Sequence, residues 1–392
     1  MKILTLQALL NTQWLDIATL TLLQPQLGVA GACELEYELD YALQHLPQAE
    51  QDSVLLEKGG IAPVGNLRIK DALEPLNPDS TLHLRYFTVA DVADRNIDFL
   101  EYAQQMGAIS GGATGAGGEA PKLLIRVSPE QQVWIDTYQQ NFEQPDQYYL
   151  VKFPRNNRSE IDCNILRAEY YYYRELHDLG FDTIDVNRMK LIEGRQYPSL
   201  WLPRFDTEWQ NECWQRYGLE SVYSILNKSA GSHLNHFEVI EQLCSILTSI
   251  DPNFDGSAFV CEWLQRDLLN IIFGNSDNHG RNTSFLKKFG SITLAPIYDF
   301  APMKADPEQV VRSTTWESPY EEGGEYRWAL ITQKLAPWCP PELAFETLQR
   351  LAHKLVHLKQ RLIDKGVPQQ IVDMPVLSFD YIEAKLKRWE LL

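Results

Sequence analysis

The hydrophobic pattern of the first half of the chain is typical of β-strands. From residue 1 to about 100, short β-type segments alternate with turns that carry Pro and Gly: KILTLQ, IATLTLL, CELEYELDY and TLHLRYF. Further runs of this kind reach to about residue 205: PKLLIRVS, QQVWID, QYYLVKFP, RMKLIE and SLWLPRF, with one helical stretch after the third. The pattern predicts a small β-rich N-terminal subdomain and then a mostly antiparallel sheet that one helix interrupts.

Beyond about residue 215, apolar residues recur at helical spacing. The spacing predicts helices in FEVIEQLCSILTSI, SAFVCEWLQRDLLNIIFGN and FETLQRLAHKLVHLKQRLI. The last carries a single leucine stripe: Leu348, Leu351, Leu355, Leu358 and Leu362. A short β-type pair, TSFL and ITLAPIYDF, follows the second helix. We therefore expect an α+β chain in three parts, at residues 1–100, 101–206 and 207–392.

Composition and charge narrow the class of protein. The chain has 392 residues, 44% hydrophobic and 22% charged, which suits two or three subdomains around buried cores. Six scattered cysteines without a C-x-x-C pair favour a reducing compartment, by default the cytoplasm. Since no long apolar run and no signal-peptide pattern occur, we expect neither membrane insertion nor secretion. The net charge of −18 argues against direct nucleic-acid binding, so any contact with DNA would need a basic partner.

A glycine-rich segment, SGGATGAGGEAPK, precedes the first β-type run of the middle part. Glycine backbone can approach a phosphate closely and point its N–H groups at it, whereas the alternative is a flexible linker between domains. The segment is not a Walker A loop, because no Gly-Lys-Ser/Thr follows. The candidate phosphate-binding residues are Gly111, Gly112, Gly115, Gly117 and Gly118.

A lysine and a glutamate downstream of this loop form a second candidate pair. Lys152 stands in the strand-like run YYLVKFPR, where it is either an exposed edge charge or an inward amine placed for phosphate. Glu169 follows on a helix and could hold the lysine in place, as a glutamate does in protein kinases. Glu160, Asp162 and Glu175 compete for that role.

The stretch GNSDNHGRNTSFL carries the most specific signal. Asp277 and Asn282 are five positions apart, as are the base and the Asn metal ligand of the protein-kinase catalytic loop. A second carboxylate, Asp299, follows in LAPIYDFAPM, where the kinase pattern expects Asp-Phe-Gly, although Ala301 replaces the glycine. Phosphoryl transfer needs this set, because a base must take the hydroxyl proton and oxygen ligands must hold magnesium. Alternatively, SDNHG is simply a turn.

These segments resemble the HipA family of bacterial Ser/Thr kinases, the toxins of HipBA-type toxin–antitoxin systems. The family pattern runs Asn-x-Asp-x-His-x-Lys-Asn and then Pro-x-Tyr-Asp, and the match covers about residues 100 to 310, with YLVKFPR and GGEAPKLLI upstream. The resemblance implies a protein-kinase-like bilobal fold, with a small N-terminal subdomain and an all-helical C-terminal lobe. It also implies transfer of the ATP γ-phosphate to a protein Ser or Thr, the target being a translation component such as an aminoacyl-tRNA synthetase.

The resemblance also assigns roles to residues. It makes Asp277 the catalytic base, Asn282 and Asp299 the Mg²⁺ ligands and Lys152 a contact to the ATP phosphates. LPRFDT resembles the hinge that binds adenine through its main chain, near Arg204 and Phe205. Arg281 replaces the usual lysine and is grouped with the nucleotide site, as is His279, whose ring we expect to brace the loop.

Two regulatory features follow from the same resemblance. A serine of the glycine loop is autophosphorylated in the family, and here Ser110 is the first candidate and Thr114 the second. The loop is longer than the family's compact Ser-Gly-x-x-x-Lys form. A cognate antitoxin, a basic DNA-binding protein, is the implied partner.

Two other functions remain open at this point. The chain could be a kinase fold that binds nucleotide or an antitoxin without turnover. It could also be a metal-dependent nuclease built on Asp277, His279 and Asp299, although the acidic charge and the lack of a second His or Cys at ligand spacing argue against this.

Overall fold

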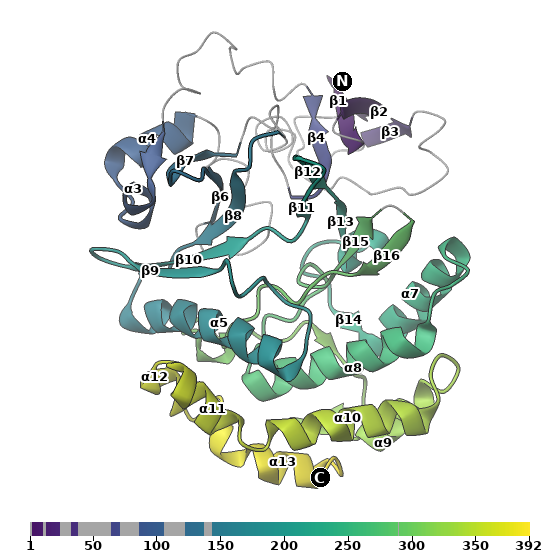
Figure 1. Ribbon diagram of the computed structural model, residues 1–392. Helices are drawn as coiled ribbons and strands as arrows, with labels where there is room; N and C mark the ends of the chain where they lie inside the picture. Colours follow the sequence, from purple (N-terminus) through teal and green to yellow (C-terminus); the bar gives the residue numbers. More distant parts are fainter. Residues whose placement is uncertain are drawn as a thin grey trace. The chain divides into compact units, whose positions relative to one another are not determined.

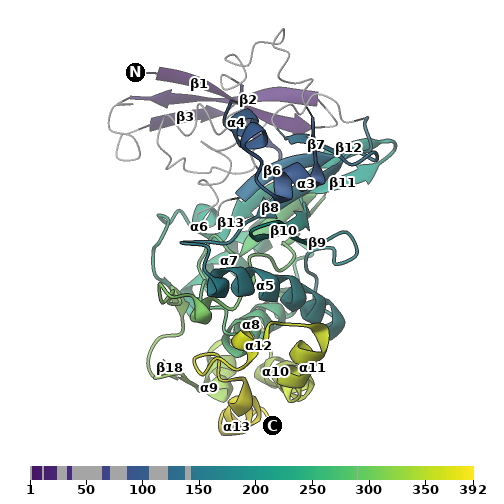
Figure 2. The ribbon, with the colours of Figure 1, turned by 90° about the vertical axis from the view of Figure 1, so that its left-hand side faces the viewer.

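The structure is a computed structural model, which describes residues 2–10, 13–23, 33–37, 64–70, 86–105, 122–136, 143–288 and 290–392 (Figures 1 and 2). The chain divides into two compact units, each assembled from three separate segments. Unit 1 comprises Met1–Arg158, Asn187–Glu220 and Ser284–Ala295. Unit 2 comprises Ser159–Val186, Ser221–Thr283 and Pro296–Leu392.

Unit 1 begins with a four-stranded sheet in the order β3-β2-β1-β4. Its neighbouring strands are antiparallel. The strands are β1 (Lys2–Leu10), β2 (Gln13–Leu22), β3 (Cys33–Tyr37) and β4 (Leu67–Ile69). Three of the predicted N-terminal runs are confirmed as β1, β2 and β3, whereas most of TLHLRYF lies outside the described residues.

The second sheet of unit 1 has six strands in the order β5-β7-β6-β8-β10-β9, and every pair is antiparallel. The strands are β5 (Phe87–Thr88), β6 (Lys122–Val127), β7 (Gln132–Ile135), β8 (Gln147–Lys152), β9 (Lys190–Glu193) and β10 (Pro198–Pro203). Helices α3 (Val89–Ala93) and α4 (Ile97–Gln105) pack on this sheet, α3 through Val92 and α4 through Phe99 and Tyr102. The antiparallel sheet predicted for the middle of the chain is confirmed.

Two smaller ladders complete unit 1. One is the hairpin of β11 (Thr207–Gln210) and β12 (Cys213–Arg216). The other has the order β13-β15-β16 and contains β13 (Gly218–Ser221), β15 (Ser284–Lys288) and β16 (Ser291–Leu294). The predicted β-type pair, TSFL and ITLAPIYDF, therefore forms β15 and β16. This pair is hydrogen-bonded to β13, a strand about seventy residues earlier in the chain.

Unit 2 is mostly helical. Its helices are α5 (Glu160–Leu179), α6 (Val222–Ile225), α7 (His236–Ile250), α8 (Gly256–Phe273), α9 (Trp328–Lys334), α10 (Pro341–Leu355), α11 (Leu358–Lys365), α12 (Gln369–Val372) and α13 (Ile382–Arg388). Helix α10 packs against α8 and α9, as Figure 1 shows. Two-residue strands also occur: β14 (Leu234–Asn235), β17 (Thr314–Thr315), β18 (Glu321–Glu322) and β19 (Glu325–Tyr326). The long elements of unit 2 are thus helices, as expected, and its two-residue strands lie in the loops between them.

The helix that carries the leucine stripe is broken in two, which corrects the prediction of one continuous helix. Helix α10 ends at Leu355 and α11 begins at Leu358, yet all five leucines are buried. His357 leaves the helical conformation (φ −102°, ψ 26°), and Arg361 Nη2 donates to the Lys354 carbonyl oxygen at 2.7 Å. The freed carbonyl is thereby satisfied, and Arg361 Nε also reaches Glu175 of α5 at 2.7 Å.

In the part of the chain that the structure describes, no helix combines the length and the apolar character needed to cross a membrane.

Candidate functional site

Helix α8 delivers the stretch that contains Asp277. The helix starts at the N-cap Asp255, whose side chain accepts from Ala258 N at 3.0 Å, and ends at Gly274 in the left-handed conformation (φ 72°). A Cβ on Gly274 would lie 2.3 Å from Leu377 Cδ2, so a side chain would clash there as well as strain the backbone. The chain therefore turns sharply out of the helix into the predicted catalytic loop.

The loop brings three predicted site residues together. Asn282 Nδ2 donates to the main-chain oxygen of Asp277 at 2.8 Å, and His279 Nε2 lies 3.3 Å from Asp277 Oδ1. Asp277 N donates to Asn275 Oδ1 at 3.3 Å. The side chains of Asp277 and His279 remain about one-fifth exposed, at 21% and 20%. The spacing of five residues thus closes a loop in which the Asn282 amide holds the backbone of Asp277.

The His279 ring lies between Asp277 and Tyr223. It stacks on the Tyr223 ring, with centroids 6.2 Å apart and planes 25° apart, and Tyr223 OH donates to Ser232 O at 2.7 Å. Gly280 permits this packing, because a Cβ there would come within 2.6 Å of Tyr223. That the ring braces the loop stays a prediction, and these contacts are its basis.

Asp299 is joined to the same loop through its neighbours. Tyr298 OH donates to Arg281 O at 2.6 Å, and Asp299 itself adopts a left-handed backbone (φ 52°). Such a conformation costs on the order of 1–3 kcal/mol in a residue other than glycine and is concentrated at functional sites. The Tyr298 bond thus joins the segment that carries Asp299 to the stretch from Asp277 to Asn282, and the backbone of Asp299 itself is strained.

Asn282 and Asp299 suit Mg²⁺ by their chemistry, since both present oxygen, the donor that Mg²⁺ prefers. A magnesium ion in a phosphoryl-transfer site takes only one or two carboxylates from the protein, and substrate phosphates and water complete its shell. Among the residues that the structure describes, no three His, Cys, Asp or Glu side chains form a metal-binding group. The assignment of the two ligands stays a prediction.

Tyr173 is a site residue that the sequence analysis missed. Its hydroxyl donates to Glu169 Oε1 at 2.8 Å and accepts from Phe300 N at 3.3 Å, so it connects α5 to the residue after Asp299. Burial raises the pKa of this hydroxyl well above its usual value, and the carboxylates of Glu169 and Asp299 raise it further. The hydroxyl therefore stays protonated. The signal available was its position one helical turn after Glu169.

Lys152 is buried in unit 1, with 4% of its surface exposed, so the exposed-edge interpretation is wrong. Its register partners are Leu200 on β10 and Lys122 on β6, and Lys122 is also buried. Residues directly opposite on neighbouring strands share a face, so both lysines belong to the same face of the sheet. The sequence analysis missed Lys122. The expected pairing of Lys152 with Glu169 stays a prediction, since the two belong to different units.

Arg204, one of the predicted hinge residues, belongs to a buried ion-pair network in unit 1. Arg204 Nη1 lies 3.0 Å from Asp136 Oδ2, and Arg204 Nε donates to Asp206 Oδ1 at 2.9 Å. Arg204 N donates to Tyr148 O at 2.9 Å. The Arg204 side chain is thus bound to two buried carboxylates, and its main-chain N–H is used within unit 1. The main-chain contact of Arg204 or Phe205 to adenine stays a prediction.

The glycine loop lies outside the described residues. This applies to the predicted phosphate-binding glycines and to both autophosphorylation candidates: Gly111, Gly112, Gly115, Gly117, Gly118, Ser110 and Thr114.

The sequence model of the HipA-like C-terminal domain matches residues 114–358, more than half of the chain. The chain belongs to this HipA-like family. The matched region contains Lys152, Asp277, Asn282 and Asp299. The family predicted from the motifs is therefore confirmed.

A solved structure shows the fold of the chain. HipA of the Shewanella oneidensis toxin–antitoxin system, determined with HipB and operator DNA, matches with a TM-score of 0.60 and 15% identity over 99% of this chain and 96% of that one. The chain thus has the mixed helix-and-sheet fold of HipA. The Helicobacter pylori proinflammatory kinase CtkA matches with a TM-score of 0.41 and 15% identity over 62% of this chain and 92% of that one. Comparison with curated proteins gives no match.

Proposed function

We propose that the chain is an ATP-dependent Ser/Thr protein kinase of the HipA type, which transfers the γ-phosphoryl group of ATP to a protein hydroxyl. One observation carries the proposal. Asp277 and Asn282 are hydrogen-bonded in one loop, and the Tyr298–Arg281 bond joins the segment that carries Asp299 to that loop. One carboxylate as base, with a carboxamide and a second carboxylate as metal ligands, is the set that kinase chemistry requires.

Asp277 has the role of base in this proposal. Its carboxylate accepts the proton of the attacking Ser or Thr hydroxyl while the oxygen bonds to the γ-phosphorus and ADP leaves. Asn282 orients Asp277 through the bond to its main-chain oxygen, and His279 lies against the carboxylate. Asn282 Oδ1 and Asp299 would hold Mg²⁺, which neutralises charge on the phosphates.

The cations of unit 1 serve the phosphates. Lys152 and Lys122 lie opposite each other on β8 and β6, both buried. In the proposal, Lys152 contacts the ATP phosphates, and Lys122, opposite it on the neighbouring strand, is a second cation for them. The glycine loop from Gly111 to Gly118 would cover the phosphates, and Ser110 or Thr114 is the proposed autophosphorylation site.

The biological setting belongs to the same proposal. The solved HipA relative is part of a complex with HipB and operator DNA. We infer that this chain is likewise a toxin with a cognate antitoxin, a basic DNA-binding protein that complements its net charge of −18. The proposed protein substrate is a translation component such as an aminoacyl-tRNA synthetase, and the proposed compartment is the cytoplasm.

The test is intact mass spectrometry after incubation with Mg-ATP, together with release of phosphate from labelled ATP. Wild-type protein should gain phosphate or turn over ATP. Asp277→Asn and Asp299→Asn should slow transfer by roughly 10²- to 10⁴-fold, because each removes a group that acts on the reacting atoms. Asp178→Asn is the matched control, since that aspartate is exposed and, among the described residues, pairs only with Lys365 and His177.

Each contrary result points to a different function. If the wild type binds Mg-ATP without transferring phosphate, the chain is a silent nucleotide-binding fold. If it cleaves nucleic acid with Mg²⁺ but without ATP, and Asp277→Ala abolishes the cleavage, it is a nuclease. Full activity in Asp299→Asn would refute the metal assignment alone.

A further inference from the structure

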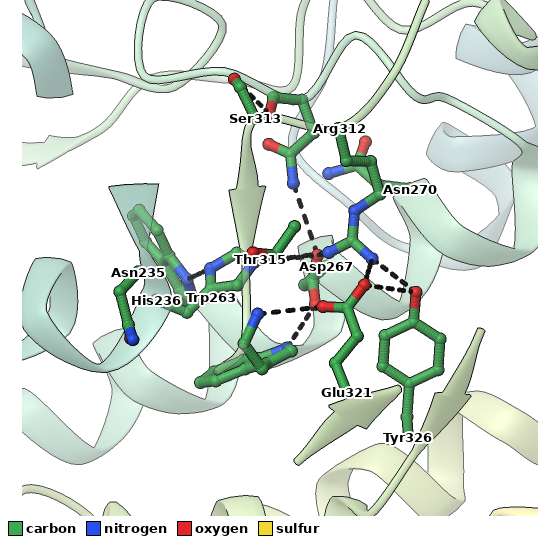
Figure 3. Close-up of polar contacts among 12 residues, drawn as sticks. Asn235, His236, Trp263, Asp267, Asn270, Arg312, Ser313, Thr315, Glu321 and Tyr326 are labelled. Atoms are coloured by element: carbon green, nitrogen blue, oxygen red, sulfur yellow. Dashed lines mark hydrogen bonds and ion pairs between the residues drawn. The ribbon is translucent and has the colours of Figure 1, made fainter. Parts of the chain in front are cut away.

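A buried ion pair in unit 2 joins helix α8 to the segment that follows Asp299. Arg312 Nη2 lies 2.7 Å from Asp267 Oδ1, and the two side chains are 9% and 1% exposed. Arg312 Nη1 donates to Glu321 Oε1 at 3.0 Å and to Tyr326 OH at 2.5 Å. Figure 3 shows the guanidinium between Asp267 on one side and Glu321 with Tyr326 on the other. Neither residue of the pair has a role in the proposed reaction.

Asp267 has a donor on each carboxylate oxygen. Oδ2 accepts from Trp316 Nε1 at 2.8 Å, and Oδ1 accepts from Asn278 Nδ2 at 3.4 Å in addition to Arg312. The carboxylate thus fixes three segments at once: its own helix, the catalytic loop and the segment after Asp299.

His236 closes the remaining side of the carboxylate. Its Nδ1 accepts from Trp263 Nε1 at 2.9 Å, so in the neutral ring Nε2 carries the proton. That Nε2 lies 3.4 Å from Asp267 Oδ1. The ring also stacks on Trp316, with centroids 4.4 Å apart. Asp267 therefore cannot turn away from Arg312 or Asn278 without losing contacts on every side.

Asn278, the residue next to Asp277, receives this network. Its carbonyl oxygen accepts from Thr314 N at 3.1 Å and from Ser313 Oγ at 3.4 Å, both directly after Arg312 in sequence. Its amide donates to Asp267. The main chain and the side chain of Asn278 are thus both held by the ion pair and its immediate neighbours, and the orientation of Asp277 depends on the peptide that links the two residues.

We propose that Asp267 and Arg312 are positioning residues that set the direction of the Asp277 carboxylate by holding Asn278. The inference rests on the proposed function, which identifies Asp277 as the base. A buried ion pair contributes little net stability compared with apolar residues of the same size, so its presence needs another reason. The reason here is geometric, because a base displaced by about 1 Å can lose on the order of 10²-fold in rate.

Helix α8 supplies matched controls. Glu262 and Arg266 form an i,i+4 ion pair on the same helix, directly before Asp267, with Glu262 42% exposed. Glu262→Gln is therefore the control for Asp267→Asn, and Arg266→Gln is the control for Arg312→Gln. Arg312→Lys keeps the charge but loses the planar fork that joins Asp267 to Glu321, and it remains informative should Asp267→Asn fail to fold.

The first measurement is the rate of phosphate transfer from Mg-ATP. We expect kcat to fall by about 10- to 100-fold in Asp267→Asn and Arg312→Gln and by less in Arg312→Lys, with KM for ATP within about threefold of wild type. The two control variants should match the wild type. If the variants lower only the fraction of folded protein and leave kcat per folded molecule unchanged, the pair only stabilises the fold.

The second measurement is hydrogen–deuterium exchange of the peptide that spans residues 275–283, which reports on the loop without any need for activity. Exchange should be faster in Asp267→Asn and Arg312→Gln than in their controls. Unchanged exchange would overturn the inference even if the wild type is an active kinase. Conversely, a wild type without transfer would refute the proposed function, and the role of the pair as an aid to catalysis would fall with it.

Discussion

Single residues in the loop from Asn275 to Asn282 are held by hydrogen bonds from nearby side chains more than by regular secondary structure. Asn275 and Asn282 contact the main chain of Asp277 from either side, and Asp267 reaches Asn278 from the preceding helix. Asn and Asp readily bond to backbone groups outside helices and sheets, which explains why they crowd into this segment. Rigidity at the end of α8 thus depends on polar side chains whose loss leaves buried groups without partners.

The charge on Asp267 should make stability depend on pH in acid. Burial alone would raise its pKa, but Arg312, His236 and Trp316 outweigh burial and lower the pKa from 3.8 to about 2. Because the folded pKa is below the unfolded one, the carboxylate stabilises the fold above about pH 4 and loses this contribution as pH falls towards 2. The difference corresponds to about 2 kcal/mol.

This prediction is checked by urea unfolding from about pH 6 to about pH 2. The stability gap between wild type and Asp267→Asn should narrow by about 2 kcal/mol over this range. Asp364→Asn serves as control, because its position on α11 is exposed and a charge there contributes little to stability. A gap for Asp267→Asn that stays constant would mean that Arg312 does not lower the pKa of this carboxyl.

At the scale of elements, two helices end in the same way but in different surroundings. Both α5 and α8 end in a left-handed glycine, Gly180 (φ 93°) and Gly274 (φ 72°). No atom of the described residues lies within 4 Å of a Cβ built on Gly180, whereas one on Gly274 meets Leu377. The left-handed backbone is therefore what favours glycine at position 180. At position 274 the close approach of Leu377 is a second reason for glycine.

The two glycines give a matched pair of substitutions. Gly180→Ala should cost about 1 kcal/mol of unfolding free energy, the penalty of a left-handed alanine. Gly274→Ala should cost about 2–5 kcal/mol, because overpacking against Leu377 is added, and it should also lower the transfer rate, since the catalytic loop follows directly. Denaturant unfolding and the phosphate-transfer assay measure the two effects. Equal costs at both positions would show that Leu377 moves aside freely.

On the scale of the whole molecule, each unit is assembled from segments distant in sequence. Helix α5 belongs to unit 2 although strands of unit 1 precede and follow it, and Ser284–Ala295 returns to unit 1 after the catalytic stretch. Every predicted catalytic-loop and metal residue, Asp277, Asn282 and Asp299, belongs to unit 2, together with Glu169. Lys152 and the hinge belong to unit 1.

The net charge of −18 leads to a prediction for the whole chain. Purified alone, it should not shift a DNA duplex in a gel even at about 50 mM salt, because too few phosphates would be neutralised. The complex with a co-expressed antitoxin should shift the same duplex, with affinity that falls as salt rises. Salt-dependent binding by the chain alone would reveal a basic surface that the total charge conceals.

The sequence by itself determined most of the helices and strands and the order of the predicted site residues along the chain. Strands β6, β7, β8, β9 and β10 and helices α7 and α8 match predicted segments, because the period of apolar residues reports which face of an element is buried. The Asp-to-Asn spacing also matched that of the kinase catalytic loop, and the two residues are joined by a hydrogen bond that needs only local contacts. The family was recognised from short motifs whose residues likewise lie close together in the sequence.

Tertiary structure alone decided which distant residues became partners. Asp267 and Arg312 are 45 residues apart and Tyr173 and Phe300 are 127 apart, and neither pair leaves a periodic signal. The break between α10 and α11 likewise depends on Arg361, which satisfies a carbonyl and reaches α5. The physical reason is the same in each case: hydrophobic period shows that a residue is buried, whereas a buried polar group is defined by the partner that folding brings to it.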